Sequence, residues 1–242
     1  MKVMGITDTG IVRKTNQDDF ACGLFESGCA WAVVCDGMGG ASGGSVASGT
    51  AVKVISEKLK EGFDGNIDMA FLKHLLQDAI NAANAEVFSI SCNDSTLFGM
   101  GTTVIVAIVT PYSVYISHAG DSRGYLISPT GAVQLTRDHS IVQDMLENGK
   151  LTLEEARQHP KKNIITRALG IEKTLNIDFC EATFADNCTL LLCTDGLTNH
   201  LEDQIICDII SSKDVTDAPG ALVSLANEYG GTDNITVVVV AK

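Results

Sequence analysis

The sequence has few basic residues, few prolines and no low-complexity segment. It contains 17 Lys and Arg against 30 Asp and Glu, and its formal net charge is −13. Proteins that bind nucleic acid or an anionic membrane usually carry a basic excess, so both partners are disfavoured. Four prolines in 242 residues and a hydrophobic fraction of 45% argue against a disordered or collagen-like chain. The acidic excess serves solubility or reflects carboxylates gathered to hold cations.

The N-terminus lacks the apolar segment that is typical of a signal peptide. Residues 95–120 contain no Asp, Glu, Lys or Arg, but Pro111 interrupts this stretch. A membrane-spanning helix needs ~20 predominantly apolar residues, so two short strands joined by a turn explain the stretch better. We therefore expect a cytoplasmic protein that does not insert into a membrane.

The eight cysteines form no C-x-x-C pair. Most lie in apolar runs such as residues 29–35, where free cysteine behaves as a small buried hydrophobic residue. Reduced core thiols are therefore favoured over disulfides or zinc ligands.

Short apolar runs and helical patterns are distributed along the whole chain. The runs predict strands at 28–35, 102–109, 113–117, 123–128, 132–135, 188–194 and 235–241. Helical periodicity predicts helices at 46–60, 69–88, 202–210 and 222–229, and residues 152–155 have the form of a capping box before a short helix. Hairpins cluster together and helices come in blocks, which favours an α+β fold. With no repeat and no linker, residues 1–242 are expected to form a single domain.

Aspartates recur at the ends of the predicted strands. They are Asp36, Asp121, Asp195 and Asp233. Each of them taken alone is explained by turn chemistry, because Asp beside Gly is a common turn pair. If the four lay together, they would repel one another unless a cation stood between them. Oxygen ligands without His or Cys suit Mg²⁺ or Mn²⁺.

The glycine-rich segment 36–44 follows a predicted strand and precedes a helix. A dinucleotide-binding G-x-G-x-x-G motif fails in register, because its last position is Ser42. The glycines instead allow the backbone to approach a metal or its waters, and a glycine carbonyl could itself be a ligand. Further upstream, Arg13 is either a bidentate phosphate ligand or an ordinary surface arginine.

These features occur together in the order of one family's motifs. The segments are Gly10-Ile-Val-Arg13, Asn16-Gln-Asp18, Asp36-Gly-Met-Gly-Gly40, Met100-Gly-Thr-Thr103, Gly120-Asp-Ser-Arg123, Leu135-Thr-Arg-Asp-His-Ser140, Ile165-Thr-Arg-Ala-Leu-Gly170, Thr194-Asp-Gly-Leu-Thr198 and Gly231-Thr-Asp-Asn-Ile-Thr236. They span almost the entire chain, and the sequence resembles the metal-dependent type 2C (PPM-type) protein phosphatases in their compact bacterial form. The resemblance implies a four-layer αββα sandwich, in which helices flank two antiparallel β-sheets, and two Mn²⁺ or Mg²⁺ ions at one end.

The resemblance also implies roles for particular residues. Asp36 would bridge the two ions, the carbonyl of Gly37 would bind the second ion, and Asp195 and Asp233 would bind the first. Asp121 would bind a third, weaker ion.

Three further features follow from the same resemblance. Asp18 would lie near the waters of the metals, and Arg13 would bind the phosphate. Residues 138–165 would form a mobile flap beside the site. His139 falls within a family motif near this flap and could influence the site.

The implied activity is that of a protein phosphoserine/phosphothreonine phosphatase. A water activated by the two Mn²⁺ or Mg²⁺ ions would attack the phosphoryl group directly, without a cysteine or histidine nucleophile. The expected partners are phosphorylated protein substrates and a bacterial serine/threonine kinase that the enzyme opposes, and the chain is expected to be a monomer.

Other functions remain open. The first is a phosphoprotein-binding regulatory module that keeps the fold with weak or no turnover. The second is a phosphatase acting on a small phosphorylated partner in a sporulation or stress-response switch. A nucleotide-binding oxidoreductase is a remote third.

Four positions depart from the family pattern, namely Gln17, Met38, Ala41 and Ser45. Gln17 stands where many relatives carry Glu, and Met38 stands where some eukaryotic relatives carry a His proposed as general acid. The donor of a proton to the leaving oxygen is therefore unassigned. All of the aspartates expected to bind the two ions directly are present, so activity is expected.

Overall fold

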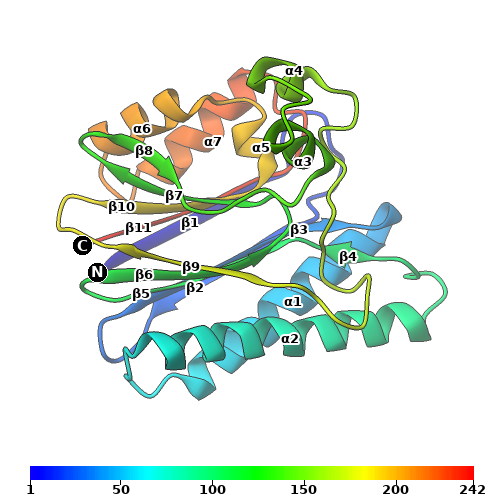
Figure 1. The fold of residues 1–242 in the computed structure, drawn as a ribbon, viewed down its shortest axis with the longest axis horizontal. Coiled ribbons are helices and arrows are strands. Elements are labelled where there is room, and N and C mark those ends of the chain that lie inside the picture. Colours follow the sequence, from blue (N-terminus) through cyan, green and yellow to red (C-terminus); the bar gives the residue numbers. More distant parts are fainter.

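The strands form two antiparallel sheets that lie face to face (Figure 1). The computed structural model describes residues 1–242 except for the side chain of Ala41, one of the departures from the family pattern. The first sheet has the order β1 (Lys2–Asp8), β11 (Ile235–Ala241), β10 (Thr189–Cys193), β7 (Arg123–Ser128) and β8 (Gly131–Gln134). The second has the order β2 (Asp18–Leu24), β3 (Ala30–Met38), β5 (Val104–Val109), β6 (Ser113–Ala119) and β9 (Asp178–Thr183), and the short β4 (Gly101–Thr102) pairs with the end of β3.

Helices cover the outer faces of both sheets (Figure 1). The second sheet is covered by α1 (Gly40–Gly62) and α2 (Met69–Asn93), and the first by α6 (Asp203–Ser212) and α7 (Ala218–Glu228). The flap segment carries α3 (Ile141–Glu147) and α4 (Leu153–Gln158), and α5 (Asp195–Thr198) is a single turn after β10. The layers thus follow the order helices, sheet, sheet, helices, which confirms the α+β class and the sandwich architecture.

The central strands are continuously apolar because both of their faces are buried. In β3, Trp31 and Val33 face α1 and α2, whereas Ala32 and Val34 face the other sheet. The same alternation in β11 sends Val237 towards α7. Burial of this kind stabilises by ~25 cal/mol per Å² of apolar surface, and it explains why these strands were predictable from sequence.

Four strands were not predicted as separate strands. One is the two-residue β4, and the other three, β1, β2 and β9, lie at the edges of the sheets. An edge strand pairs on one side only and is more open to solvent, so β1 alternates between exposed and half-buried residues instead of forming an apolar run. The predicted strands at 123–128 and 235–241 match β7 and β11.

The predicted helices differ from the structure mainly at their ends, whereas the short helices α3 and α5 were not predicted. Helix α1 begins at Gly40 rather than at residue 46, because the glycine-rich segment itself adopts the first helical turns. The capping box is confirmed, since the hydroxyl of Thr152 accepts from the amide of Glu155 and the carboxylate of Glu155 accepts from the amide of Thr152. Within the described part of the chain, no helix combines the length and the apolar character needed to cross a membrane.

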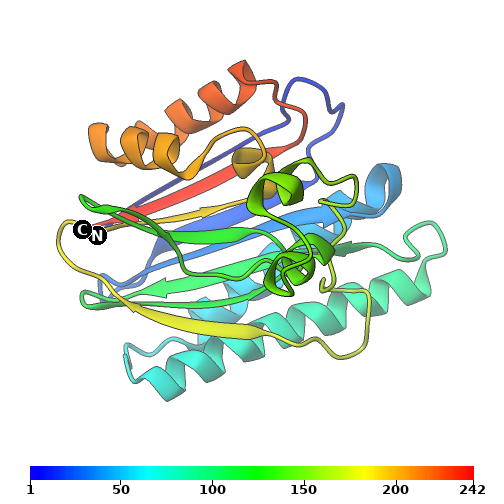
Figure 2. The same cartoon turned by 45° about the horizontal axis from the view of Figure 1, so that its top comes forward.

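The two chain ends lie beside each other, and the acidic strand ends lie at the other end of the sandwich. Lys2 pairs with Ala241, and Asp8 pairs with Ile235 at the far end of the same ladder. Figure 2 shows the flap helices near this far end, away from the termini. Antiparallel pairing therefore brings together, at one end of the sandwich, several segments that are distant in sequence.

Candidate metal and phosphate site

Asp18 and Asp36 lie directly opposite each other on β2 and β3. Asp18 is buried, and its Oδ2 accepts hydrogen bonds from the hydroxyls of Thr194 (2.8 Å) and Thr236 (2.7 Å). Its Oδ1 is buried and has no hydrogen-bond partner among the described atoms. One oxygen of this carboxylate is therefore held in place, while the other is available to a water or a cation.

Asp36 lies at the centre of the acidic cluster. Its backbone is fixed by Thr102 and Thr103: its amide donates to the hydroxyl of Thr103 (2.9 Å), and its carbonyl accepts from the hydroxyl of Thr102 (2.8 Å). Its buried side chain is exposed to the charges of Asp18 and Asp195. The end of β3 is thus a rigid platform that aims this carboxylate at the others.

The carboxylates perturb one another. Burial, followed by the neighbouring charges, raises the pKa of Asp36 and of Asp121 well above the ordinary value. The pKa of Asp195 is raised by burial and by Asp233. Burial likewise raises the pKa of Asp18 to about 7, although its two threonine partners oppose this. Clustered carboxylates with raised pKa values mark a functional site or a site for positive charge.

Arg13 supplies a positive charge at the rim of the cluster. Its guanidinium Nη2 lies 2.7 Å from Oδ2 of Asp233, and its side chain is half exposed. Within the described part of the protein, its other guanidinium nitrogens make no hydrogen bond, so they remain available to an anion. The structure thus brings Arg13 to the acidic strand ends.

The loop that carries Arg13 is held by Asn234. This buried amide accepts from the backbone N–H of Gln17 (2.8 Å) and donates to the carbonyls of Thr9 (2.9 Å) and Thr15 (3.0 Å). Three contacts from one side chain place the N-terminal loop against the start of β11.

Gly37 and Gly44 lie in close contact where β3 gives way to α1. A Cβ on Gly44 would lie 2.7 Å from the carbonyl oxygen of Gly37, and one on Gly37 would collide with the carbonyl of Gly44. Gln17 stabilises the same junction, because its side chain donates to the carbonyl of Gly40 (2.9 Å) and its carbonyl accepts from Ser48 (2.6 Å). Gln17 therefore connects the N-terminal loop to the start of α1 by hydrogen bonds, and it does not add a carboxylate to the acidic cluster as a glutamate would.

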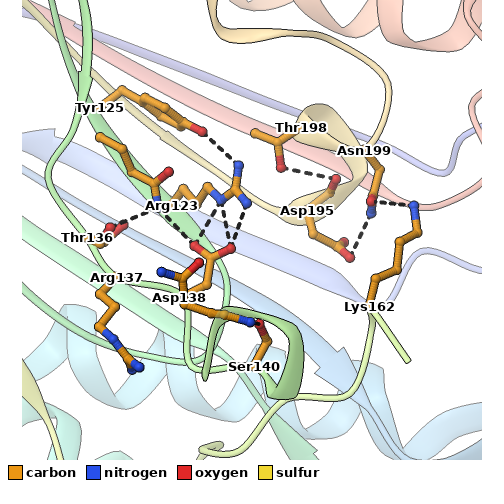
Figure 3. Close-up of polar contacts among 12 residues, drawn as sticks. Arg123, Tyr125, Thr136, Arg137, Asp138, Ser140, Lys162, Asp195, Thr198 and Asn199 are labelled. Atoms are coloured by element: carbon orange, nitrogen blue, oxygen red, sulfur yellow. Dashed lines mark hydrogen bonds and ion pairs between the residues drawn. The ribbon is translucent and has the colours of Figure 1, made fainter. Parts of the chain in front are cut away.

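A cavity of about 370 Å³ lies between the flap and the acidic cluster, and Asp121 and Asp195 are among the residues that line it. Figure 3 shows that Lys162 of the flap donates to Oδ1 of Asn199 (2.9 Å), whose amide donates to Asp195 (2.9 Å). The flap is thus connected through one asparagine to a predicted metal ligand.

The first residue of the flap is fixed by a bidentate ion pair (Figure 3). Arg123 donates to both oxygens of Asp138, at 2.6–3.0 Å, and to the hydroxyl of Tyr125 at 3.0 Å. The ion pair lies between β7 and the flap, next to Asp121.

The donor set suits hard divalent cations. It consists of carboxylate oxygens and a backbone carbonyl, and one of the carboxylate oxygens is the buried, unpartnered Oδ1 of Asp18. Arg13 adds a positive charge beside this set through its ion pair with Asp233. Mg²⁺ and Mn²⁺ prefer such oxygen ligands, and positive charge would relieve the repulsion that raises the pKa values. The residues present therefore fit the ions that the fold implies.

Sequence reasoning did not identify four supporting residues. They are Thr194, Thr236, Asn234 and Asp138. Each lies inside a motif already quoted, beside or near a predicted site residue. Their roles depend on long-range partners, so their position in the motifs was the only signal available.

Three comparisons with known proteins agree with this geometry. A profile of the protein phosphatase 2C family matches residues 11–218. The serine/threonine phosphatase stp of Listeria monocytogenes is 39% identical over 239 residues, covering 98% of this chain and 94% of that protein. The solved serine/threonine phosphatase of S. agalactiae superposes with a TM-score of 0.92 at 30% identity, covering 100% of this chain and 99% of the other.

A further solved relative contains metal. The catalytic domain of the serine threonine protein phosphatase PstP, solved in complex with two manganese ions, superposes with a TM-score of 0.86 at 30% identity, covering 98% of this chain and 96% of the other. The fold and the acidic site define a metal-dependent hydrolase of the protein phosphatase class. The chain belongs to the protein phosphatase 2C family, which confirms the resemblance and the enzyme class expected from the sequence.

Proposed function

We propose that this protein is a metal-dependent phosphoserine/phosphothreonine phosphatase that uses two Mn²⁺ or Mg²⁺ ions, with a third bound more weakly. The observation that carries the proposal is the convergence of Asp18, Asp36, Asp195 and Asp233, from four distant segments, on one face beside Arg13. The proposed substrates are phosphorylated proteins, including those of a serine/threonine kinase that the enzyme opposes. Residues 1–242 are proposed to form one catalytic domain, whose flap spans 138–165.

The chain would hold the ions as follows. Asp36 would contribute to both ions, the carbonyl of Gly37 would contribute to one of them, and Asp195 and Asp233 would hold the other. Asp121 binds the third. When bound, the two ions supply an activated water for attack on phosphorus and positive charge for the phosphoryl oxygens.

Asp18 orients water beside the ions. Its Oδ2 is fixed by two threonine hydroxyls, so its free Oδ1 can accept a hydrogen bond from a water with little loss of freedom. Without metal, burial raises the pKa of this group to about 7, and a bound cation would favour its ionised form, which is the form that accepts a hydrogen bond from water.

Arg13 binds the phosphoryl group. If Asp233 held a bound ion, its ion pair with Arg13 would be weaker, and the guanidinium donors of Arg13 would be able to bind two phosphoryl oxygens. Asn234 keeps the loop in the position from which Arg13 can reach them.

Hydrolysis of a phosphothreonine peptide tests the proposal. The purified protein is assayed with EDTA, with Mg²⁺ and with Mn²⁺, beside the Asp195→Asn variant and the exposed Asp208→Asn variant as a control. Turnover that requires a divalent ion, collapses in Asp195→Asn and survives in Asp208→Asn is the expected result. If folded protein binds the peptide but does not hydrolyse it in the presence of Mg²⁺ or of Mn²⁺, the proposal is contradicted and the phosphoprotein-binding module is favoured.

A further inference from the structure

His139 lies at the point where the flap meets the body of the protein. Its side chain is fully buried, although it carries two polar nitrogens. Its backbone amide donates to the carbonyl of Gly120 (2.9 Å), and its backbone carbonyl accepts from Thr166 (2.8 Å), where the chain leaves the flap. The residue is therefore attached both to the flap's return segment and to the turn that carries Asp121.

The imidazole makes a second, side-chain contact with this turn. Nδ1 of His139 lies 3.1 Å from the backbone N–H of Gly120, in a fully buried hydrogen bond. A backbone N–H only donates, so Nδ1 accepts and the ring hydrogen of the neutral imidazole is on Nε2. Without this acceptor the buried N–H of Gly120 would lose its partner, at a cost that proteins rarely tolerate.

The turn at Gly120 has little freedom of its own. Its φ is +117°, a conformation that favours glycine, and a Cβ there would lie 2.6 Å from Cβ of Thr103. The turn is thus confined by sterics on one side and by the imidazole on the other. Asp121 follows directly, and the Gly120 carbonyl, which belongs to the peptide joined to Asp121, accepts from the backbone amide of His139. Both peptide groups of Gly120 are therefore held by His139.

The other edge of the imidazole faces Asp178. Nε2 lies 3.1 Å from Oδ2 of Asp178 and also 3.1 Å from Nη1 of Arg167, which donates to Oδ1 of Asp178 at 2.6 Å. A guanidinium nitrogen only donates, so with the ring hydrogen on Nε2 the acceptor for that hydrogen is Asp178 and not Arg167. Partial burial raises the pKa of Asp178, but its hydrogen bonds to His139 and Arg167 bring the pKa below the ordinary value. This ionised carboxylate holds the ring in the orientation and the tautomer that let Nδ1 accept.

A metal site at this cluster is not favoured. The rings of His118 and His139 are stacked, with centroids 4.8 Å apart and planes only 7° from parallel. Nitrogen lone pairs lie in the ring planes, so two parallel rings do not converge on one ion, and Arg167 already neutralises Asp178. The cluster is better explained as a support for the Gly120 turn.

We propose that His139 is a positioning residue, which holds Asp121 in the orientation needed to bind the third divalent ion by accepting the Gly120 amide. The inference rests on the proposed function, in which Asp121 is a metal ligand. Groups that orient a metal ligand typically change metal affinity about 10–100-fold when they are replaced.

Three substitutions separate the two edges of the ring. In His139→Asn, the side-chain oxygen can take the place of Nδ1 and accept from Gly120, but the link to Asp178 is lost. In His139→Gln, the amide reaches the place of Nε2 and Asp178, but the acceptor for Gly120 is lost. His139→Leu removes both contacts, and Asp121→Asn removes the ligand itself.

The readout is the number and affinity of Mn²⁺ ions bound, measured by titration calorimetry and by the loss of the free-Mn²⁺ electron paramagnetic resonance signal. Thermal unfolding of each metal-free variant is recorded alongside. We expect His139→Leu and His139→Gln to lower the affinity for the third ion about 10–100-fold, as we expect of Asp121→Asn, while the two tighter ions still bind. His139→Asn should restore the third ion.

The outcomes separate this inference from the proposed function. If Asp121→Asn leaves Mn²⁺ binding unchanged, the assignment of Asp121 is wrong and the inference falls with it. If Asp121→Asn weakens the third ion but His139→Gln does not, or if His139→Asn fails to restore it, the inference alone is wrong. If His139→Leu fails to fold, the comparison of His139→Asn with His139→Gln still shows whether the acceptor for the Gly120 amide supports binding of the third ion.

Discussion

The guanidinium of Arg13 lies 2.7 Å from the carboxylate of Asp233, although 220 positions separate the two residues in sequence. The pairing places a cation from the N-terminal loop at the edge of an acidic cluster built from strand ends. It depends on Asn234, which holds that loop at three points. The phosphate-binding role proposed for Arg13 therefore depends on a contact between opposite ends of the chain.

Replacement of Arg13 should impair catalysis more than folding. Hydrogen bonds to a charged group are worth about 1.5–3 kcal/mol, so Arg13→Ala should lower kcat/KM for a phosphopeptide about 10–100-fold. Arg13→Lys keeps the charge but loses the bidentate donors, and it should recover only part of this loss. The neighbouring exposed Lys14→Ala is the matched control; equal losses in both variants would show that only general charge matters.

The metal-free protein should become less stable as the pH rises from about 4 to about 7. The pKa of Asp18 is raised from 3.8 to about 7, so in this range the folded state keeps a proton that the unfolded state has released. Asp18 by itself makes stability fall with rising pH by up to about 1.4 kcal/mol for each pH unit. The raised pKa values of Asp36, Asp121 and Asp195 add to the same trend.

Urea unfolding in EDTA at pH 5 and at pH 7.5 measures this effect. Asp18→Asn should reduce the slope by the share that Asp18 contributes, and saturating Mn²⁺ should reverse the pH dependence, because a cation favours the ionised carboxylates. An unchanged slope in Asp18→Asn would contradict the assignment.

Asn234→Ala should loosen the N-terminal loop. The substitution leaves the Gln17 amide and the carbonyls of Thr9 and Thr15 without their partner, and we expect a loss of about 2–4 kcal/mol in the free energy of unfolding. Because Arg13 lies on the same loop, KM for a phosphopeptide should rise as well. Chemical denaturation and steady-state kinetics test the two effects separately, and a stability loss with an unchanged KM would disconnect the loop from substrate binding.

Breaking the pair between Arg123 and Asp138 should destabilise the base of the flap. The Asp138 side chain is 11% exposed and that of Arg123 is 29% exposed, so Asp138→Ala leaves a largely desolvated cation unpaired. After allowance for the partial exposure, we expect a loss of about 2–3 kcal/mol.

Asp144→Ala provides the comparison, since Asp144 is half exposed and its partner Arg137 keeps Glu147. That variant should lose less than about 1 kcal/mol. Similar melting temperatures for the two variants would show that the buried pair contributes nothing special.

Much of the architecture followed from local patterns. The strands buried on both faces, such as β5 and β11, appear as continuous apolar runs, and the capping box at Thr152 is written in four consecutive residues. The edge strand β1 escaped prediction, because an edge strand owes its structure to the neighbour with which it pairs rather than to its own composition.

The site divides in the same way. The sequence shows the acidic residues at strand ends, Arg13 and the glycines before α1, because the residue type alone indicates what a carboxylate, a guanidinium or a glycine can do. Only the tertiary structure decided that Arg13 meets Asp233, that two threonines hold Asp18, and that the imidazole of His139 holds the turn before Asp121. These contacts join segments through sheet register and buried hydrogen bonds, and such long-range geometry exists only once the whole chain has folded.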